Sequence, residues 1–158
     1  DDEAESILSR VRSWGDENQE KVLQQQLFTK GVSKIRETHP EALLELIADF
    51  MESTKKESRR GGLYALIPLL EDDSFQNLPV VYRLLSRLLQ NEETSLLKEI
   101  VAVIEKIAKR SQQEAAFFLR EKLKTASKPR IFRVVRQSLP FFSDEYARRL
   151  REDLRKHE

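Results

Sequence analysis

Apolar residues recur along the chain at intervals of three and four positions, the spacing that places them on one face of an α-helix. Capping residues and prolines divide this pattern into segments, and we expect about nine helices. The first three cover about 3–13, 16–37 and 41–51, and the other six begin near 58, 79, 94, 111, 129 and 143. No alternating run rich in Val, Ile or Thr leads into a hairpin turn, so no strand is predicted.

Several residues set the expected helix boundaries. Pro40 and Pro129 suit a first helical position, where the N–H that proline lacks has no partner in any helix. Thr94 can cap the helix with the most regular apolar stripe, and Ser143 can cap the last helix. The long second helix is expected to bend at Gly31.

From residue 41 onward, a unit of two helices recurs about every 36 residues. Short helices joined by short loops bury their apolar faces against sequence neighbours, and stacked pairs form a curved solenoid. The sequence therefore predicts an all-α, HEAT-like superhelix of antiparallel helix pairs that forms a single domain over 1–158. A globular helical bundle is the alternative. Because the chain begins with Asp, we expect N-terminal helices of a longer natural chain to precede it.

The composition supports helices and excludes several classes of protein. Of 158 residues, 35% are charged, four are glycine, five are proline and none is cysteine. A disulfide framework and thiolate metal sites are therefore excluded, and no apolar run approaches the ~20 residues that cross a bilayer. We expect a cytoplasmic protein with no membrane segment, no metal and no cofactor.

Charge is distributed unevenly along the chain. Residues 1–105 hold 13 Lys and Arg against 20 Asp and Glu, whereas residues 106–158 hold 15 against 7. The basic end is a candidate surface for a polyanion. The alternative is that both charged parts serve only solubility.

Two sets of cations are candidate phosphate contacts. Near the start of the fourth expected helix stand Lys55, Lys56, Arg59 and Arg60, followed by Gly61-Gly62. A helix start favours phosphate, and the glycines would allow it a close approach. The alternative is that the glycines only let two helices pack closely.

The second set lies in and before the helix that begins near 129. Ile131, Val134 and Val135 mark its buried face, which leaves the opposite side and the preceding segment for Arg130, Arg133, Arg136 and Lys128, with Lys122 and Lys124 upstream. Such a row can follow a phosphate backbone. Five phenylalanines occupy apolar positions, and we expect them in the core rather than on a base-stacking surface: Phe117, Phe118, Phe132, Phe141 and Phe142.

Candidate catalytic groups are few. His39 and His157 have no ligand or catalytic partner at helical spacing, and we expect both at the surface. The acidic residues 71–73 share one loop, and adjacent carboxylates without a cleft are expected to be solvated.

Three short motifs occur in a characteristic order. Ser13-Trp14-Gly15-Asp16 follows the first helix, His39-Pro40-Glu41 opens the third, and Glu52-Ser53 leads to Arg60 in the fourth. In these motifs, and in its helix lengths and order after residue 94, the chain resembles the C-terminal two-thirds of bacterial alkylpurine DNA glycosylases of the AlkD type over about 7–136. The resemblance implies a HEAT-like solenoid that holds duplex DNA by its backbone and excises cationic methylated purines. It also places Arg60 where that family has a DNA-contacting arginine.

The catalytic residues of that family are not matched. Its first tryptophan and its aspartate would fall on Gly15 and Gln19, unless Trp14 and Asp16 replace them in a shifted register, and its second tryptophan falls near Val103. Glutamine cannot supply the negative charge that stabilises an oxocarbenium ion, and Gly and Val lack the aromatic face that holds a cationic base. We expect a relative that has kept the scaffold and lost glycosylase activity.

Three functions remain open on the sequence. The preferred one is a duplex-DNA-binding module related to DNA alkylation repair enzymes. The others are an active alkylpurine glycosylase, with Trp14 and Asp16 as its candidate catalytic residues, and a scaffold for a protein partner. The fold does not choose among them, since solenoids have many unrelated functions.

Overall fold

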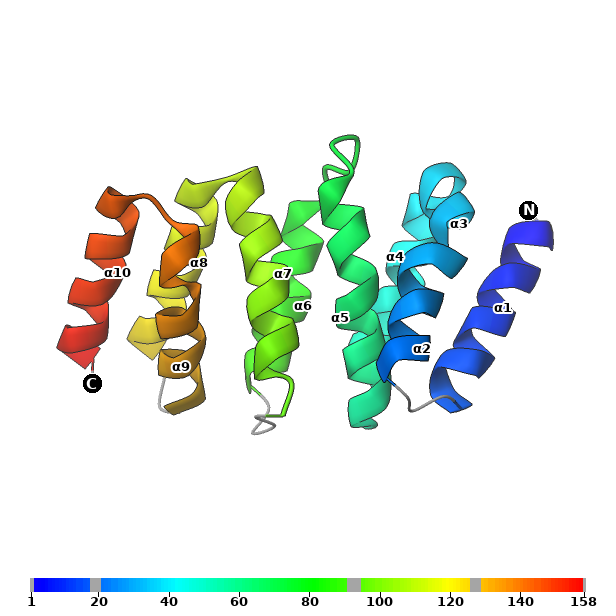
Figure 1. Cartoon of the computed structure of the whole chain (residues 1–158), viewed down its shortest axis with the longest axis horizontal. Helices are drawn as coiled ribbons and strands as arrows, with labels where there is room; N and C mark the ends of the chain where they lie inside the picture. The colour runs from blue at the N-terminus through cyan, green and yellow to red at the C-terminus, as the bar shows by residue number, and fades with distance from the viewer. Residues whose placement is uncertain (1, 18–20, 91–94, 126–128, 158) are drawn as a thin grey trace. The chain divides into compact units, whose positions relative to one another are not determined.

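The computed structural model describes residues 2–17, 21–90, 95–125 and 129–157, with the backbone alone at 14–17, 22 and 23. All regular elements of the described residues are helical, and none is a strand (Figure 1). They are α1 (Asp2–Glu17), α2 (Lys21–Gln26), the π-helix η1 (Leu27–Gly31), α3 (Ser33–Thr38), α4 (Pro40–Met51), α5 (Lys56–Glu71), α6 (Leu78–Gln90), α7 (Leu97–Arg110), α8 (Gln112–Thr125), α9 (Pro129–Ser138), the 3-10 helix η2 (Leu139–Phe141) and α10 (Asp144–His157). The prediction of an all-α fold is confirmed.

The long helix expected over 16–37 is interrupted. α2 passes into the wider turn of η1, which ends at Gly31, and α3 begins two residues later. Val32 between them has φ −107° and ψ 10°, outside the α-helical region, and the Arg36 side chain donates across the break to the Thr29 carbonyl at 3.0 Å. The break falls beside Gly31, where the sequence predicts a bend, but the single helix expected over 16–37 is wrong, and residues 16 and 17 belong to α1. Apolar spacing does not reveal a change in the number of residues per turn.

The proline boundaries agree with the structure. Pro40 is the first residue of α4 and Pro129 the first of α9. Pro68 lies inside α5, which continues to Glu71, although proline supplies no N–H to the helix. Thr94 lies outside the described residues, but α7 begins at Leu97 with Leu96 at its cap position and no side-chain cap, so the expectation that Thr94 caps this helix is wrong.

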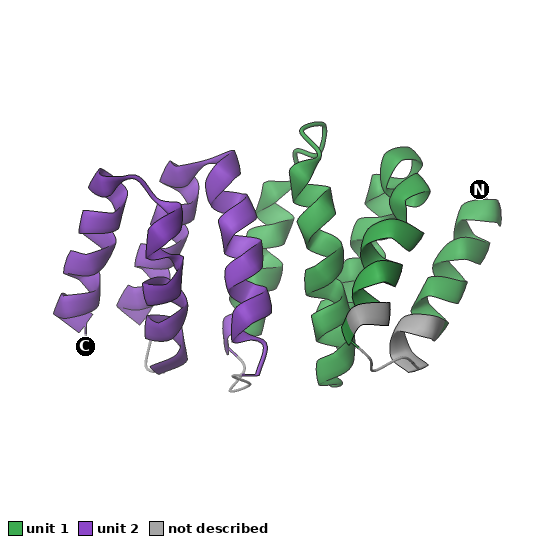
Figure 2. Ribbon diagram, in the orientation of Figure 1, with its two compact units in different colours: residues 1–88 green, residues 89–158 purple. Residues whose placement is uncertain are grey.

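The chain divides into two compact units, Asp1–Leu88 and Leu89–Glu158 (Figure 2). Each unit has buried apolar side chains of its own, including Leu63, Leu66 and Leu70 in the first and Ile100, Leu119 and Leu150 in the second. The single domain expected over 1–158 stays a prediction.

The first unit is built on the contact between α4 and α5, the most extensive between any two of its helices. At Gly62 a Cβ atom would lie 2.6 Å from Met51 Cγ and 3.2 Å from both the Ile47 carbonyl oxygen and the Met51 amide nitrogen. Real Cβ atoms do not approach other atoms so closely. The two helices can therefore meet at this distance only because residue 62 has no side chain.

The preceding glycine makes room for an aromatic side chain of η1. At Gly61 a Cβ atom would lie 2.7 Å from the ring of Phe28, which is fully buried and meets the Phe50 ring edge-on at 5.1 Å. The two glycines thus admit α4 and η1 to neighbouring positions on α5. The packing alternative considered for Gly61-Gly62 describes what they do in the first unit.

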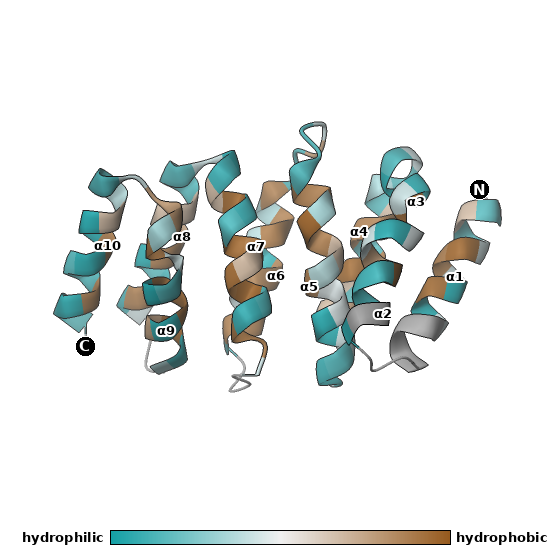
Figure 3. Cartoon of the chain, viewed as in Figure 1, coloured by the Kyte–Doolittle hydropathy of each residue, from teal (hydrophilic) through white to brown (hydrophobic). Residues whose placement is uncertain are grey.

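In the second unit, helices two apart in the sequence lie side by side. α7 contacts α9 and α8 contacts α10, while α7 also contacts α8. Each helix buries a stripe of mostly apolar residues, and the ribbons of α7 and α9 carry both hydrophobic and hydrophilic colours (Figure 3). The buried stripe of α7 is formed by Ile100, Val103, Ile104 and Ile107.

A Gly62→Ala variant should lower the free energy of unfolding by about 1–3 kcal/mol, because overpacking forces apart backbone atoms that cannot rotate away. Urea unfolding followed by circular dichroism measures the change.

Gly31→Ala is the matched control. Its Cβ atom would lie 3.4 Å from the Leu27 side chain and 4.0 Å from the Gln26 carbonyl oxygen, both ordinary contacts, so stability should stay unchanged or rise by about 0.5–1 kcal/mol. Equal destabilisation by both substitutions would contradict the assignment of a packing role to Gly62.

Candidate nucleic-acid interface

The cationic segment at the start of α5 is divided between surface and interior. Lys55 is exposed and Lys56 half-buried, whereas Arg59 and Arg60 are only 7% and 5% exposed. The expectation of four cations open to a ligand is therefore wrong for both arginines. They follow the helix onto the face that packs against the rest of the first unit.

Arg60 is held by a buried glutamine. Its Nε donates to Gln24 Oε1 at 2.8 Å, and Gln24 Nε2 in turn donates to the Glu57 carbonyl at 2.6 Å. Gln24 is completely buried, so this chain of hydrogen bonds joins α2 to the first turn of α5 inside the unit. Arg59 Nη1 donates to the Ser53 carbonyl at 2.9 Å, which ties the same turn to the end of α4.

The glycines beside these arginines leave no room for a phosphate group. Phe28 occupies the space next to Gly61, and Met51 occupies the space next to Gly62. The helix start itself has no side-chain cap, and the Lys55 amide donates to Ser53 Oγ at 3.1 Å. What this segment offers to a ligand at its surface is therefore Lys55 and Lys56.

On α9 the buried face is wider than expected. It includes Arg130, which is 3% exposed, with Ile131, Val134, Val135 and Ser138. Residue 130 precedes residue 134 by four positions and therefore lies on the same side of the helix. The expectation that Arg130 lies on the outer side is wrong.

Arg133 and Arg136 are exposed, as expected. They stand three positions apart, so their side chains are neighbours on one outer face of α9. The 22 residues from Lys122 to Ser143 contain six Lys and Arg and no Asp or Glu. This run without acidic residues indicates a purely cationic surface, and a charge count over residues 106–158 does not reveal it because acidic residues on either side are included.

The lysines before α9 differ in their surroundings. Lys122 Nζ lies 5.4 Å from the centre of the Phe118 ring, and Lys124 Nζ lies 3.1 Å from the Glu121 carboxylate. Lys128 lies outside the described residues, so its contact with nucleic acid stays a prediction.

Sequence reasoning missed the cations of α10. Ala147, Leu150 and Leu154 form its buried stripe, and this spacing leaves five cations exposed: Arg148, Arg149, Arg151, Arg155 and Lys156. Four acidic residues share the helix, and one of them, Glu145, pairs with Arg149 at 2.7 Å. α10 is thus a surface of mixed charge, unlike α9.

The five phenylalanines do not all lie in the core. Only Phe142 is buried, Phe118, Phe132 and Phe141 are half-buried, and Phe117 is 66% exposed. The buried stripe of α8 runs through Ala115, Ala116, Leu119 and Leu123, which puts residue 117 on the far side. The expectation of a core position for Phe117 is wrong for this reason.

The residues that the resemblance to alkylpurine glycosylases would align with catalytic positions offer little chemistry. Val103, near the place of the second tryptophan, is fully buried in the apolar stripe of α7. Trp14, Gly15 and Asp16 belong to α1, where the structure describes only the backbone, and Gln19 lies outside the described residues. The catalytic role of Trp14 and Asp16 stays a prediction.

Other chemistry-bearing residues are scattered. His39 is half-buried with its Nδ1 atom 2.8 Å from Thr38 Oγ1, and His157 ends α10. No group of three metal-ligating side chains occurs in the described part of the chain. Within the same residues, no helix is both long and apolar enough to cross a membrane.

Comparison with protein-family models, with curated proteins and with solved structures gives no match for this chain.

A Gln24→Leu variant should lower the free energy of unfolding by about 1–3 kcal/mol, because it removes the acceptor that holds the buried Arg60 guanidinium. Gln25→Leu changes an exposed neighbour on the same helix and should have little effect. Urea unfolding of both variants makes the comparison, and equal effects would show that the buried hydrogen bonds do not matter.

A second buried charge accompanies Arg130. Glu99, near the start of α7, is 6% exposed, and α7 contacts α9 and runs in the same direction (Figure 1). The two buried charges of opposite sign thus lie at the same end of two contacting helices. A buried charge is tolerated where an opposite charge compensates it, so we expect Glu99 and Arg130 to stabilise each other.

Glu99→Gln should therefore destabilise the protein by about 3–5 kcal/mol, and combining it with Arg130→Met should cause less loss than the two single changes together. Glu105→Gln, which removes a carboxylate 3.7 Å from Lys109 at the surface of the same helix, should change stability by less than about 1 kcal/mol. Strict additivity in the double-mutant cycle would argue against mutual stabilisation.

Proposed function

We propose that the chain is a nucleic-acid-binding module, that its ligand is duplex DNA, and that the exposed face of α9 makes the main contact. The observation that carries this proposal is the exposed pair Arg133 and Arg136 on a segment without a single acidic residue. The helix itself contributes no carboxylate to this face, since α9 contains no Asp or Glu.

Phosphate is the chemistry that this face suits best. A guanidinium group can donate two parallel hydrogen bonds to one phosphate, and two neighbouring arginines can hold successive positions of a backbone. Contacts of this kind position a duplex without recognising its bases, so the binding should depend weakly on sequence. Lys55 and Lys56 are further candidate contacts, in the first unit.

The helical framework is also consistent with the proposal. The contacts of α7 with α9 and of α8 with α10 are those of stacked helix pairs, as in a HEAT-like superhelix. The motifs shared with alkylpurine DNA glycosylases favour DNA over other polyanions. We do not propose glycosylase activity, because Val103 is buried in the core where that family has a tryptophan.

Changing both Arg133 and Arg136 to Ala should weaken binding to a duplex by about tenfold or more near 0.1 M salt. The plot of log K against the logarithm of the salt concentration should become less steep, with the magnitude of its slope reduced by about two, since two phosphate contacts and their released counterions are lost. Fluorescence anisotropy of a labelled duplex at several salt concentrations measures both quantities.

The control removes the same charge elsewhere. Lys30 and Lys34 are exposed cations of the first unit, and changing both to Ala should leave the salt slope nearly unchanged. An equal loss in both double variants would mean that only net charge matters. Absence of binding at low salt would refute the proposal outright.

A further inference from the structure

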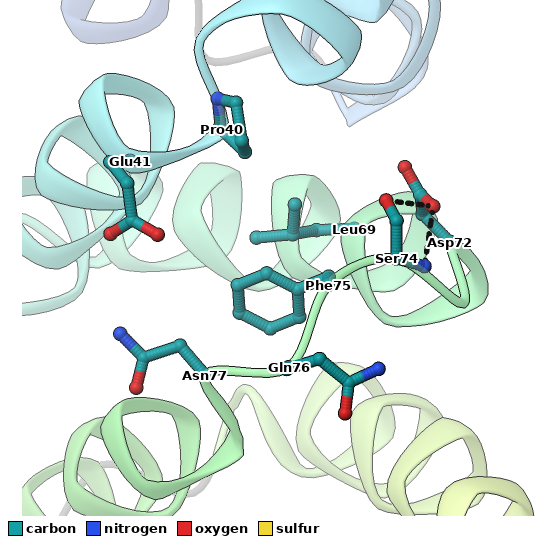
Figure 4. A pocket seen from close by; sticks show the side chains of 8 residues that line it. All are labelled: Pro40, Glu41, Leu69, Asp72, Ser74, Phe75, Gln76 and Asn77. Atoms are coloured by element: carbon teal, nitrogen blue, oxygen red, sulfur yellow. Dashed lines mark hydrogen bonds between the residues drawn. The ribbon is translucent and has the colours of Figure 1, made fainter.

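A pocket of about 380 Å³ opens in the first unit beside the start of α4 (Figure 4). Its walls come from the first turn of α4, the last turn of α5 and the loop that joins α5 to α6. Pro40, Leu69 and Phe75 supply its apolar surface, and the ring of Phe75 lies in the middle of the view.

The loop that forms one wall is fixed by its own hydrogen bonds. Asp72 Oδ1 accepts from the Ser74 amide at 3.0 Å and from Ser74 Oγ at 2.7 Å, and the Asp72 carbonyl accepts from the Phe75 amide at 3.0 Å. Gln76 Nε2 donates to the Asp73 carbonyl at 2.7 Å. Phe75, 6% exposed, anchors the loop in the core. The pocket is therefore formed before any ligand arrives.

The charge of the pocket is entirely negative. Glu41 and Asp72 lie on either side of the Phe75 ring, and no Lys, Arg or His contributes to the lining (Figure 4). Asp72, which we expected to be solvated, is half-buried here. The first unit as a whole is acidic, with 12 Lys and Arg against 16 Asp and Glu over residues 1–88. The field in and around the pocket favours a cation.

We propose that this pocket binds an arginine side chain of a basic peptide segment in a partner protein. The guanidinium N–H groups donate to the Glu41 carboxylate, and the planar cation meets only the small exposed part of the Phe75 ring, which is 6% exposed. This site is independent of the DNA contact proposed for α9.

A peptide side chain fits the site better than a free small cation does. Glu41, Ser74 and Gln76 are exposed, so the pocket is open to solvent and cannot enclose a ligand on all sides. A long side chain can enter such a site while its backbone stays outside. Burying the aliphatic part of arginine against the half-buried Pro40 adds apolar contact that a compact cation lacks.

The test uses the whole chain and a fluorescein-labelled nine-residue peptide of alternating arginine and glycine. Anisotropy should show saturable binding, and the same peptide with neutral citrulline in place of arginine should bind at least tenfold more weakly. In ¹H–¹⁵N spectra, the unlabelled arginine peptide should shift the amide signals of residues 72–77.

Glu41→Gln should raise the dissociation constant of the arginine peptide about three- to tenfold, whereas Glu45→Gln, one turn further along α4 and also exposed, should leave it unchanged. Equal losses in the two variants would overturn the proposal in favour of general acidity. So would amide shifts that spare residues 72–77, or spermidine displacing the peptide at equal concentration, which would identify a site for free amines.

Discussion

The close approach of α5 to its neighbours at Gly61 and Gly62 is the constraint on which the first unit depends. One glycine admits the Phe28 ring and the next admits the backbone of α4, so two elements pack against consecutive residues of a single helix. Their proximity also decides the fate of the adjacent polar groups. With Phe28 seated on Gly61, Gln24 lies within hydrogen-bond distance of Arg60, and the guanidinium becomes part of the interior. The arginines of this cationic segment therefore hold the start of α5 to its neighbours inside the unit rather than forming a surface.

The sequence predicts the helices well because helix formation depends on the local spacing of apolar residues and on the positions of prolines. The boundaries at Pro40 and Pro129 depend on the residue itself and on its immediate neighbours. The width of a helix's buried face cannot be predicted in this way, because it depends on how many other helices pack around that helix. α9 contacts both α7 and α8 as well as α10, so burial extends to Arg130, beyond the stripe that its apolar residues mark. Phe117 is the opposite case, an apolar residue on a side of α8 that no described helix covers.

The candidate site could be predicted from the sequence only in part, for the same reason. Arg133 and Arg136 follow from the period of α9, but the interior positions of Arg59 and Arg60 depend on α2 and α4, which pack from elsewhere in the chain. The negative pocket was not predicted, since Glu41, near the start of α4, and Asp72, just after α5, are far apart in the sequence and line one pocket only in the fold. The sequence does contain one further signal, the run without acidic residues that includes α9, and the charge count over residues 106–158 did not reveal it.

Burial also changes what a cationic motif means for binding. A phosphate contact contributes to affinity by releasing counterions from the nucleic acid, and the cation must be exposed to make that contact. Arg60 already donates to Gln24, and Arg130 is buried in a unit that also buries Glu99. Pulling the Arg60 guanidinium outward would break its hydrogen bond, and pulling Arg130 outward would move a side chain that is only 3% exposed, so both movements oppose any gain from phosphate. The number of cations in a sequence motif is therefore an upper bound on its phosphate contacts, and in α9 the packing of its neighbours reduces three arginines to two.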